Sequence, residues 1–154
     1  MAGLFILFAV INFSALGVGA WLMGNPRTNT WYQRANKAPW TPPNWVFGAA
    51  WTAIMVCFTL FLWLTVRNQG SYPLNLLYII LGVQWVLNVL WNPVFFRWHQ
   101  PAPALALIIA LTAVVTWFMV WGFINVGAIA VLVVPYFLWL LVAASLNWYV
   151  LAKN

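Results

Sequence analysis

Acidic side chains are missing from this sequence. Its 154 residues contain no Asp and no Glu, which removes paired-carboxylate acid–base catalysis, the acidic member of a nucleophilic triad and carboxylate sites for hard cations. Cysteine and histidine occur once each, as Cys57 and His99, too few for an intrachain disulfide or a zinc cluster. We therefore expect no ordinary hydrolase, and for His99 an interfacial structural role, with helix capping and haem ligation as alternatives.

Charge of either sign is scarce. Charged residues make up 4% of the chain and hydrophobic residues 66%, and the mean hydropathy of +0.95 lies far outside the range of soluble domains. The six cations are scattered, so they form no basic stripe for nucleic acid. None lies in the middle of an apolar run, which argues against energised transport through a charged relay.

Five apolar runs are long enough to cross a bilayer, which takes roughly 20 helical residues. Pro and Gly separate the runs, and none alternates as a barrel strand would. We predict an all-α integral membrane protein, a single five-transmembrane-helix bundle over residues 1–154 with a long first loop that acts as a lid. The expected spans are about residues 2–23, 45–66, 74–96, 102–124 and 128–151.

The cations predict the orientation in the membrane. With five spans, the first loop, the third loop and the C-terminus share one side, which carries every cation except Arg67. Positive residues favour the cytoplasmic side, so we expect the N-terminus outside and the first loop and C-terminus in the cytoplasm, in a bacterial cell membrane. The cations on that side are Arg27, Arg34, Lys37, Arg97 and Lys153.

The first loop is rich in aromatic residues and leads into a helix with large side chains at helical spacing: Phe47, Trp51, Met55 and Phe58. Such a stripe is typical of a core or lipid-facing surface as well as of a binding site. The last span has Pro135, Trp139, Ala143 and Leu146 on one face, where small residues beside a large ring leave room for a flat apolar guest or for a neighbouring helix.

Amides recur every fourth residue in the third span, at Gln84, Asn88 and Asn92. Amide side chains that face lipid would lack hydrogen-bond partners, which costs free energy. We therefore expect this stripe to face the inside of the bundle, either as hydrogen-bonding contacts between helices or as pocket lining. The fourth span carries small residues on one flank, which predicts a helix-packing seam. Its members are Ala102, Ala106, Ala110 and Ala113.

Aromatic rings, amides and shape are the remaining chemistry, and they suit a flat hydrophobic ligand. The chain resembles the TspO, or translocator protein, family of tryptophan-rich membrane proteins over nearly its whole length. The resemblance is carried by Trp31-Tyr32, Lys37, Trp40-Thr41-Pro42-Pro43 and Trp51, by Asn88 with Trp91-Asn92-Pro93-Val94-Phe95-Phe96, and by Pro135-Tyr136-Phe137-Leu138-Trp139 with Leu146-Asn147.

The resemblance implies a five-helix bundle, often a homodimer, with no obligatory cofactor, whose cavity beneath the first loop binds protoporphyrin IX, haem and isoquinoline-type drugs. It implies a sensor, carrier or scavenger of tetrapyrroles. The ligand-binding residues it implies are Tyr32, Trp40, Pro42, Phe47, Trp51, Met55, Asn88, Trp91, Trp139 and Ala143. The alternative is light-dependent protoporphyrin degradation, with Trp51 and Trp139 as photochemical candidates; a third reading is a structural scaffold with no saturable binding.

Two positions depart from the family pattern. The lid proline is shifted by one residue in Lys37-Ala38-Pro39-Trp40, which alters the expected path of the lid. The sterol-recognition pattern is matched loosely by residues 146–153, where Trp148 stands in place of the usual Tyr or Phe. Sterol patterns of this kind are weak, so we do not predict a sterol as the natural ligand.

Overall fold

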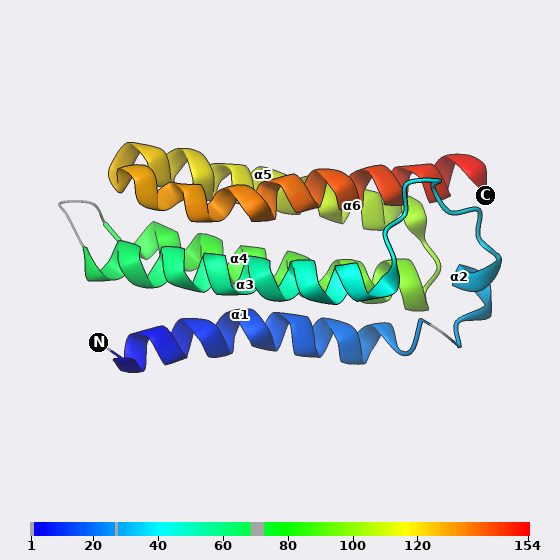
Figure 1. Ribbon diagram of the computed structural model, residues 1–154, viewed down its shortest axis with the longest axis horizontal. Coiled ribbons are helices and arrows are strands. Elements are labelled where there is room, and N and C mark those ends of the chain that lie inside the picture. Colours follow the sequence, from blue (N-terminus) through cyan, green and yellow to red (C-terminus); the bar gives the residue numbers. More distant parts are fainter. Residues whose placement is uncertain (1, 27, 69–72) are drawn as a thin grey trace.

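The computed structural model describes residues 2–26, 28–68 and 73–154, and this part of the chain is a bundle of helices (Figure 1). Five segments are long and apolar enough to span a membrane, which confirms the predicted all-α membrane fold. The elements are α1 (Ala2–Met23), α2 (Thr30–Arg34), α3 (Asn44–Arg67), α4 (Asn75–Asn92), the π-helix η1 (Pro93–Arg97), α5 (Pro101–Asn125), the 3₁₀-helix η2 (Gly127–Val133) and α6 (Val134–Lys153).

The observed spans agree with the predicted ones to within a few residues, but two of them are not uniformly α-helical. The third span ends in η1, where the backbone N–H of Trp98 donates to the carbonyl of Pro93, five residues back, at 2.9 Å. Pro93 lacks an N–H and its ring crowds the preceding turn, and a wider π turn relieves that conflict. The fifth span begins with η2, entered through Gly127 at φ 61°, a backbone conformation that glycine adopts without steric cost.

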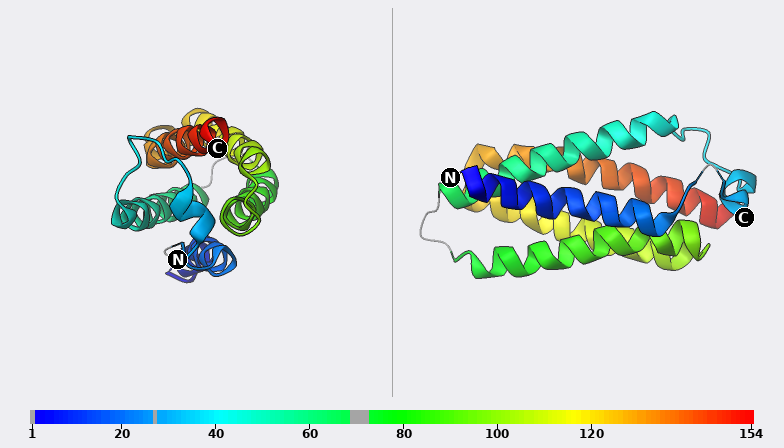
Figure 2. Two further views of the ribbon diagram at one scale, coloured as in Figure 1. Left: turned by 90° about the vertical axis from the view of Figure 1, so that its right-hand side faces the viewer. Right: turned by 90° about the horizontal axis from the view of Figure 1, so that it is seen from below.

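The five spans form a closed ring. Helix α1 packs against α3 and α4, α5 packs against α4 and α6, and η2 contacts α3 and α5. Figure 2, left, looks down this ring from the end that carries α2. Because α3 meets the last span chiefly through η2, at the end far from α2, the boundary between α3 and α6 is packed less tightly towards α2.

Aromatic rings fill the centre of the bundle. The Phe58 ring meets Phe118 edge-on at 5.1 Å and Tyr136 edge-on at 5.6 Å, and it stacks near Phe61 at 6.0 Å. All four side chains are fully buried. Outward-facing positions are also apolar, Ile6, Val10 and Ile79 among them, as expected for a surface that faces lipid rather than water.

Polar side chains lie inside the bundle and join the helices to one another. Asn12 Nδ2 of α1 donates to Thr59 Oγ1 of α3 at 2.9 Å, and Gln84 Nε2 of α4 donates to the Tyr136 hydroxyl of α6 at 2.8 Å. Trp85 Nε1 donates to the Ile11 carbonyl at 3.1 Å. Hydrocarbon offers no partner to such groups, so these bonds fix how each helix is rotated.

The amide stripe looks inward, as predicted. Gln84 and Asn88 are buried and Asn92 is partly buried. Gln84 makes the hydrogen bond to Tyr136 described above, so at this position the stripe joins two helices and does not line a pocket. Asn92 Nδ2 donates to the Asn88 carbonyl of its own helix at 3.3 Å.

The alanine seam of the fourth span does not pack within the chain, so that prediction was wrong for intrachain contacts. All four alanines are exposed. The face of α5 that enters the core is larger and lies on the other side of the helix, because large apolar side chains bury more surface. It consists of Ala104, Ile108, Leu111, Val115, Phe118 and Gly122.

The polar ends of the bundle carry unequal charge. Helix α2, the loop between η1 and α5, and the C-terminal end of α6 lie at one end, while the start of α1 lies at the other (Figure 1). Arg34, Lys37, Arg97 and Lys153 are at the α2 end, and Arg67 closes α3 at the opposite end. Arg27, also predicted on the α2 side, lies outside the described residues.

Gly122 tests the packing of the core. A Cβ at Gly122 would lie 2.9 Å from the Ala130 Cβ and 3.0 Å from Phe61 Cε2, whereas a Cβ at Gly82 meets nothing within 4 Å. We expect Gly122→Ala to destabilise the fold by about 1–3 kcal/mol through overpacking. Gly82→Ala should leave stability unchanged or raise it by up to about 1 kcal/mol. Thermal unfolding of the purified protein in detergent measures both, and equal melting temperatures would contradict the packing described.

Candidate functional site

The short helix α2 is attached to the third span. Asn29 caps it: the side-chain Oδ1 accepts from the Tyr32 N–H at 3.1 Å, and the same side chain donates through Nδ2 to the Phe96 carbonyl. The Tyr32 ring meets Phe96 edge-on at 5.0 Å, and the Trp31 ring meets Phe95 edge-on at 5.6 Å. Asn29 thus orders α2 and joins it to η1 at once.

His99 takes part in the same attachment. Its ring stacks on Trp31 with centroids 4.7 Å apart and an interplanar angle of 22°. The backbone of His99 has φ 54°, a conformation that is uncommon for residues other than glycine. His99 adopts it where the chain reverses between η1 and α5. The contact gives His99 a structural position at the end of the bundle, in keeping with the role predicted for it.

Residues 35–43 form the lid that runs from α2 to α3. Figure 2, left, shows α2 and the lid passing across the end of the helical ring. The lid is tied to α6 at two points. Asn36 exchanges hydrogen bonds with the last turn, its N–H donating to Asn154 Oδ1 at 2.8 Å and its Nδ2 to the Lys153 carbonyl at 3.1 Å. Trp40 Nε1 donates to Ser145 Oγ at 3.2 Å.

A cavity of about 50 Å³ lies beneath the lid. It is found where α3 and α6 are least tightly packed: no side chain is fully buried in residues 44–53 of α3 or 141–146 of α6. The lining is mainly aromatic and aliphatic and draws on α2, the lid, α3, α4, η1 and α6. The lining residues are Tyr32, Lys37, Thr41, Phe47, Trp91, Phe95, Phe96, Ala143, Leu146, Asn147 and Val150.

Four of the ten residues predicted to bind ligand line this cavity: Tyr32, Phe47, Trp91 and Ala143. Trp40 and Pro42 belong to the lid but do not line the cavity. Trp40 is 52% exposed and meets Tyr149 edge-on at 5.4 Å, on the outer side of α6. The lid therefore brings Thr41 and Lys37 over the cavity and turns Trp40 away from it.

The other four predicted residues lie deeper in the bundle. Trp51 packs edge-on against Tyr136 at 5.8 Å, and Met55 is fully buried in the core. Trp139 does not line the cavity, but its ring meets that of the lining residue Phe47 edge-on at 5.5 Å. Asn88 is buried one helical turn before Trp91. The two photochemical candidates, Trp51 and Trp139, are thus behind the cavity wall, and their photochemistry stays a prediction.

Several buried polar atoms around the cavity make no hydrogen bond to any residue that the structure describes. Two belong to its lining: the Trp91 Nε1 donor and the Asn147 Oδ1 acceptor. Two more, Asn88 Nδ2 and Trp139 Nε1, lie in the deeper layer. Asn12 Oδ1 and Gln84 Oε1, in the middle of the bundle, also lack a partner among the described residues, but only the four named above lie at or next to a cavity. Buried polar groups are nearly always paired, so these four are the polar contacts that a bound molecule would satisfy.

The polar side chains over the cavity carry no negative charge. Lys37 Nζ lies 4.5 Å from the centre of the Tyr32 ring, a cation–π distance. Burial raises the pKa of the Tyr32 phenol above its usual value, so the phenol stays neutral at physiological pH. The cavity therefore presents one cation and neutral hydrogen-bonding groups on an aromatic surface.

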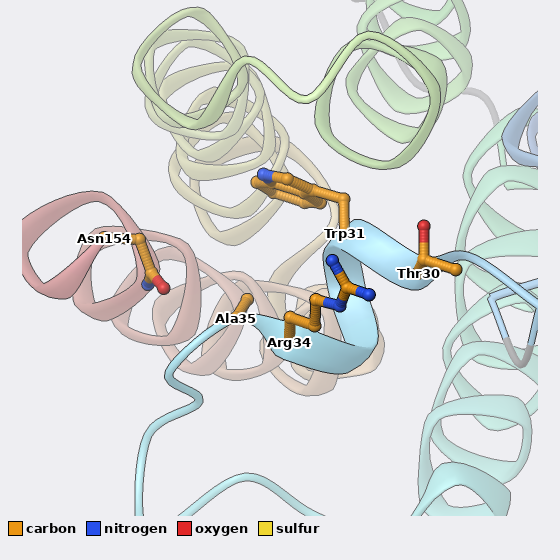
Figure 3. Close-up of a pocket in the computed structure, with 5 residues that line it drawn as sticks. All are labelled: Thr30, Trp31, Arg34, Ala35 and Asn154. Carbon is orange, nitrogen blue, oxygen red and sulfur yellow. The ribbon is translucent and has the colours of Figure 1, made fainter.

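A larger cleft of about 320 Å³ lies outside the lid, between α2 and the end of α6. Figure 3 shows Trp31 and Arg34 projecting from α2, with Asn154 facing them from the last turn of α6. The cleft is open at the surface and has only one large ring, Trp31, among its five lining residues. The cavity under the lid is less open and is lined mainly by aromatic and aliphatic side chains, so it is the better candidate for an apolar ligand.

The residues that were missed as candidates come from motifs that the sequence displays. Lys37, Phe95, Phe96, Leu146 and Asn147 all stand in the stretches that carry the family resemblance, and the cavity draws them together. Asn147 was identifiable as a lone amide in an apolar span. Thr41 also stands in such a stretch, beside Trp40, but only the path of the lid shows that Thr41 and not Trp40 lines the cavity. Val150 stands outside the motifs that carry the resemblance, and its place depends on the rotation of α6.

Comparison with known proteins settles which group of proteins has this arrangement. The sequence pattern of the TspO/MBR family matches residues 6–152. The chain belongs to this family. It is 34% identical to the tryptophan-rich sensory protein of Cereibacter sphaeroides, over 83% of this chain and 79% of the relative.

Similar membrane proteins occur in other kinds of organism. The tryptophan-rich protein TspO of Archaeoglobus fulgidus is 30% identical over 97% of this chain and 96% of its own length. The human translocator protein is 30% identical over 80% of this chain and 75% of its own length. The family match over residues 6–152 includes the lid and every residue that lines the cavity, so the cavity lies within the part of the chain that matches the TspO/MBR family.

The attachment of α2 can be tested through Asn29. Asn29→Ser keeps an N-cap acceptor but is too short to reach the Phe96 carbonyl, and losing one hydrogen bond of about 1 kcal/mol should speed opening of α2 and the lid about fivefold. Asn29→Ala should open further because the cap is lost as well. Trypsin cleavage after Arg34 and Lys37, followed by mass spectrometry, measures the opening.

Gln33→Ala is the matched control, because Gln33 Nε2 donates to the Pro26 carbonyl within the same connecting segment and not to the bundle. Wild-type cleavage of Asn29→Ser would show that ring contacts alone hold α2 in place.

Proposed function

We propose that this TspO/MBR protein is a membrane receptor for porphyrin-type tetrapyrroles, bound beneath the lid and acting as sensor, carrier or scavenger. The observation that carries the proposal is the cavity itself: its walls are aromatic rings, and two buried polar atoms of its lining, Trp91 Nε1 and Asn147 Oδ1, have no partner among the described residues. A flat macrocycle with hydrogen-bonding groups suits such walls, because rings stack on rings and the polar atoms gain partners.

The closed cavity is too small for a tetrapyrrole. Its volume of about 50 Å³ compares with the roughly 300–1,000 Å³ of sites that hold drug-sized ligands. Binding therefore requires the lid to move and Phe47 to separate from Trp139. That motion is inexpensive on the α6 side, where the side-chain hydrogen bonds of Asn36 and Trp40 hold the lid and each such bond contributes only about 0.5–1.5 kcal/mol.

The proposed opening would also bring the deeper predicted residues into the pocket. Trp51, Met55, Asn88 and Trp139 lie directly below the cavity wall, between α3, α4 and α6. Opening of the loosely packed boundary between α3 and α6 would extend the cavity to them and expose the unpartnered Nε1 of Trp139 and Nδ2 of Asn88. A ligand that fills the enlarged site satisfies these atoms, so ligand binding and opening favour each other.

We also propose that the lid faces the cytoplasm. Among the described residues, four cations lie at the lid end and one at the opposite end. Cytoplasmic ends of membrane proteins are enriched in Lys and Arg. A ligand released from the cavity through the lid would then enter the cytoplasm.

Binding is tested by titrating protoporphyrin IX in the dark into protein in detergent and following tryptophan quenching. We expect saturable binding to the wild type. Ala143→Phe places a ring in the cavity, and overpacking of this kind costs about 1–3 kcal/mol, so the affinity should fall about tenfold or more. The matched control is Ala113→Phe, on the exposed face of α5, which should bind as the wild type does.

Quenching that never saturates, or that is the same in Ala143→Phe and the wild type, would mean that the porphyrin partitions nonspecifically into detergent and protein surface. The protein would then be a structural membrane component rather than a receptor.

A further inference from the structure

Lys37 differs from the other cations that the structure describes. Arg34, Arg67, Arg97 and Lys153 are exposed, whereas Lys37 is partly buried and lines the cavity beneath the lid. A partly buried ammonium loses part of its hydration, a cost that is normally recovered by a negatively charged partner. The partial burial of the Lys37 ammonium therefore lowers the stability of the closed protein.

The chain supplies no side chain that could balance this charge. There is no Asp and no Glu in the sequence, and Lys37 makes no ion pair or hydrogen bond through Nζ with any described residue. Its contact is the face of Tyr32, at 4.5 Å. Tyr32 cannot serve as a phenolate, since burial raises its pKa. No side chain of the protein can therefore supply an anion to pair with Lys37, and a bound acid can.

The surroundings of Lys37 indicate what else that molecule carries. Tyr32 is in edge contact with Phe96 at 5.0 Å, and Phe96 is tilted against Trp91 at 6.1 Å. A continuous aromatic surface thus leads from the cation to the unpartnered Trp91 Nε1. A molecule with an apolar ring body and an acid group at its edge fits both features at once.

We propose that Lys37 is the specificity-determining residue of the cavity and that it selects ligands with a carboxylate at the edge of an apolar ring system. This inference rests on the proposed function and deepens it, because it states which part of the ligand is held under the lid. Closure of residues 35–43 places Lys37 over the bound acid, so the acid group binds the lid while the ring body binds the spans.

Two sources could supply the anion, a ligand carboxylate or a lipid phosphate, and the proposal commits to the ligand. Lys37 is partly buried in a cavity lined by α2, the lid, α3, α4, η1 and α6, rather than exposed on the outer surface where headgroups lie. The exposed Lys153, on the last turn of α6, is the cation at the same end of the bundle that is placed for headgroups.

The test compares protoporphyrin IX with its dimethyl ester, which keeps the ring and removes the acid. Both are titrated in the dark into protein in nanodiscs of phosphatidylcholine, with empty discs subtracted, for the wild type, Lys37→Met, Lys37→Arg and the matched control Lys153→Met. A hydrogen bond to a charged group is worth enough to change affinity by about tenfold or more. We expect the wild type to prefer the diacid by this factor.

Lys37→Met should lose that preference and bind the diacid no more tightly than the diester, and an unchanged melting temperature shows that the variant is folded. Lys37→Arg and Lys153→Met should keep it. The proposal is overturned by equal wild-type affinity for diacid and diester, or by loss of the preference in Lys153→Met. Equal weakening of both ligands in Lys37→Met would mean that Lys37 supports the cavity by packing rather than by its charge, and would also overturn the proposal. A lipid phosphate at Lys37 would instead give equal wild-type affinity for the two ligands. If neither ligand saturates the wild type, the proposed function itself fails.

Discussion

The structure depends on one constraint, that polar groups inside the bilayer must find their partners within the protein. Asn12 with Thr59 and Gln84 with Tyr136 meet this requirement, and each pair fixes two helices at a defined rotation. With the helices so placed, the rings of Phe58, Phe118 and Tyr136 close the centre of the bundle. Packing is thus decided by a few hydrogen bonds and completed by aromatic shape, because a lipid environment gives apolar side chains no reason to prefer one another over the acyl chains.

The same constraint makes the lid end different from the rest of the molecule. There the boundary between α3 and α6 is loosely packed, and Trp91, Asn147, Asn88 and Trp139 keep polar atoms without a described partner. Asn12 Oδ1 and Gln84 Oε1 also lack a described partner, but they lie in the tightly packed middle of the bundle and not next to a cavity. A bundle that is tightly packed in the middle and loosely packed at the lid end is suited to admit a guest without losing its fold. The core remains closed while the lid and the adjoining ends of α3 and α6 move.

The absence of Asp and Glu side chains affects the site as strongly as the aromatic rings do. A chain with no acid of its own leaves each cation to seek a partner among solvent, lipid or ligand. For exposed cations this costs little, because water and headgroups are at hand. For Lys37 beneath the lid it means that recognition of an acidic ligand needs no exchange of an existing ion pair, so the whole electrostatic gain is available for binding.

The sequence by itself determined the fold class, the five spans and the family, since apolar length and the WNPVFF-type motifs are local properties. It also identified the inward amide stripe of Gln84 and Asn88. Only the tertiary structure decided which side chains reach the cavity. Trp40 is turned out towards Ser145 and Tyr149 while Lys37 and Thr41 turn in, because the path of the lid depends on where α2 docks on η1. The alanines of α5 lie on the outside of the bundle for a similar reason. Spacing tells which residues share a helix face, but contacts with neighbouring helices decide where that face points.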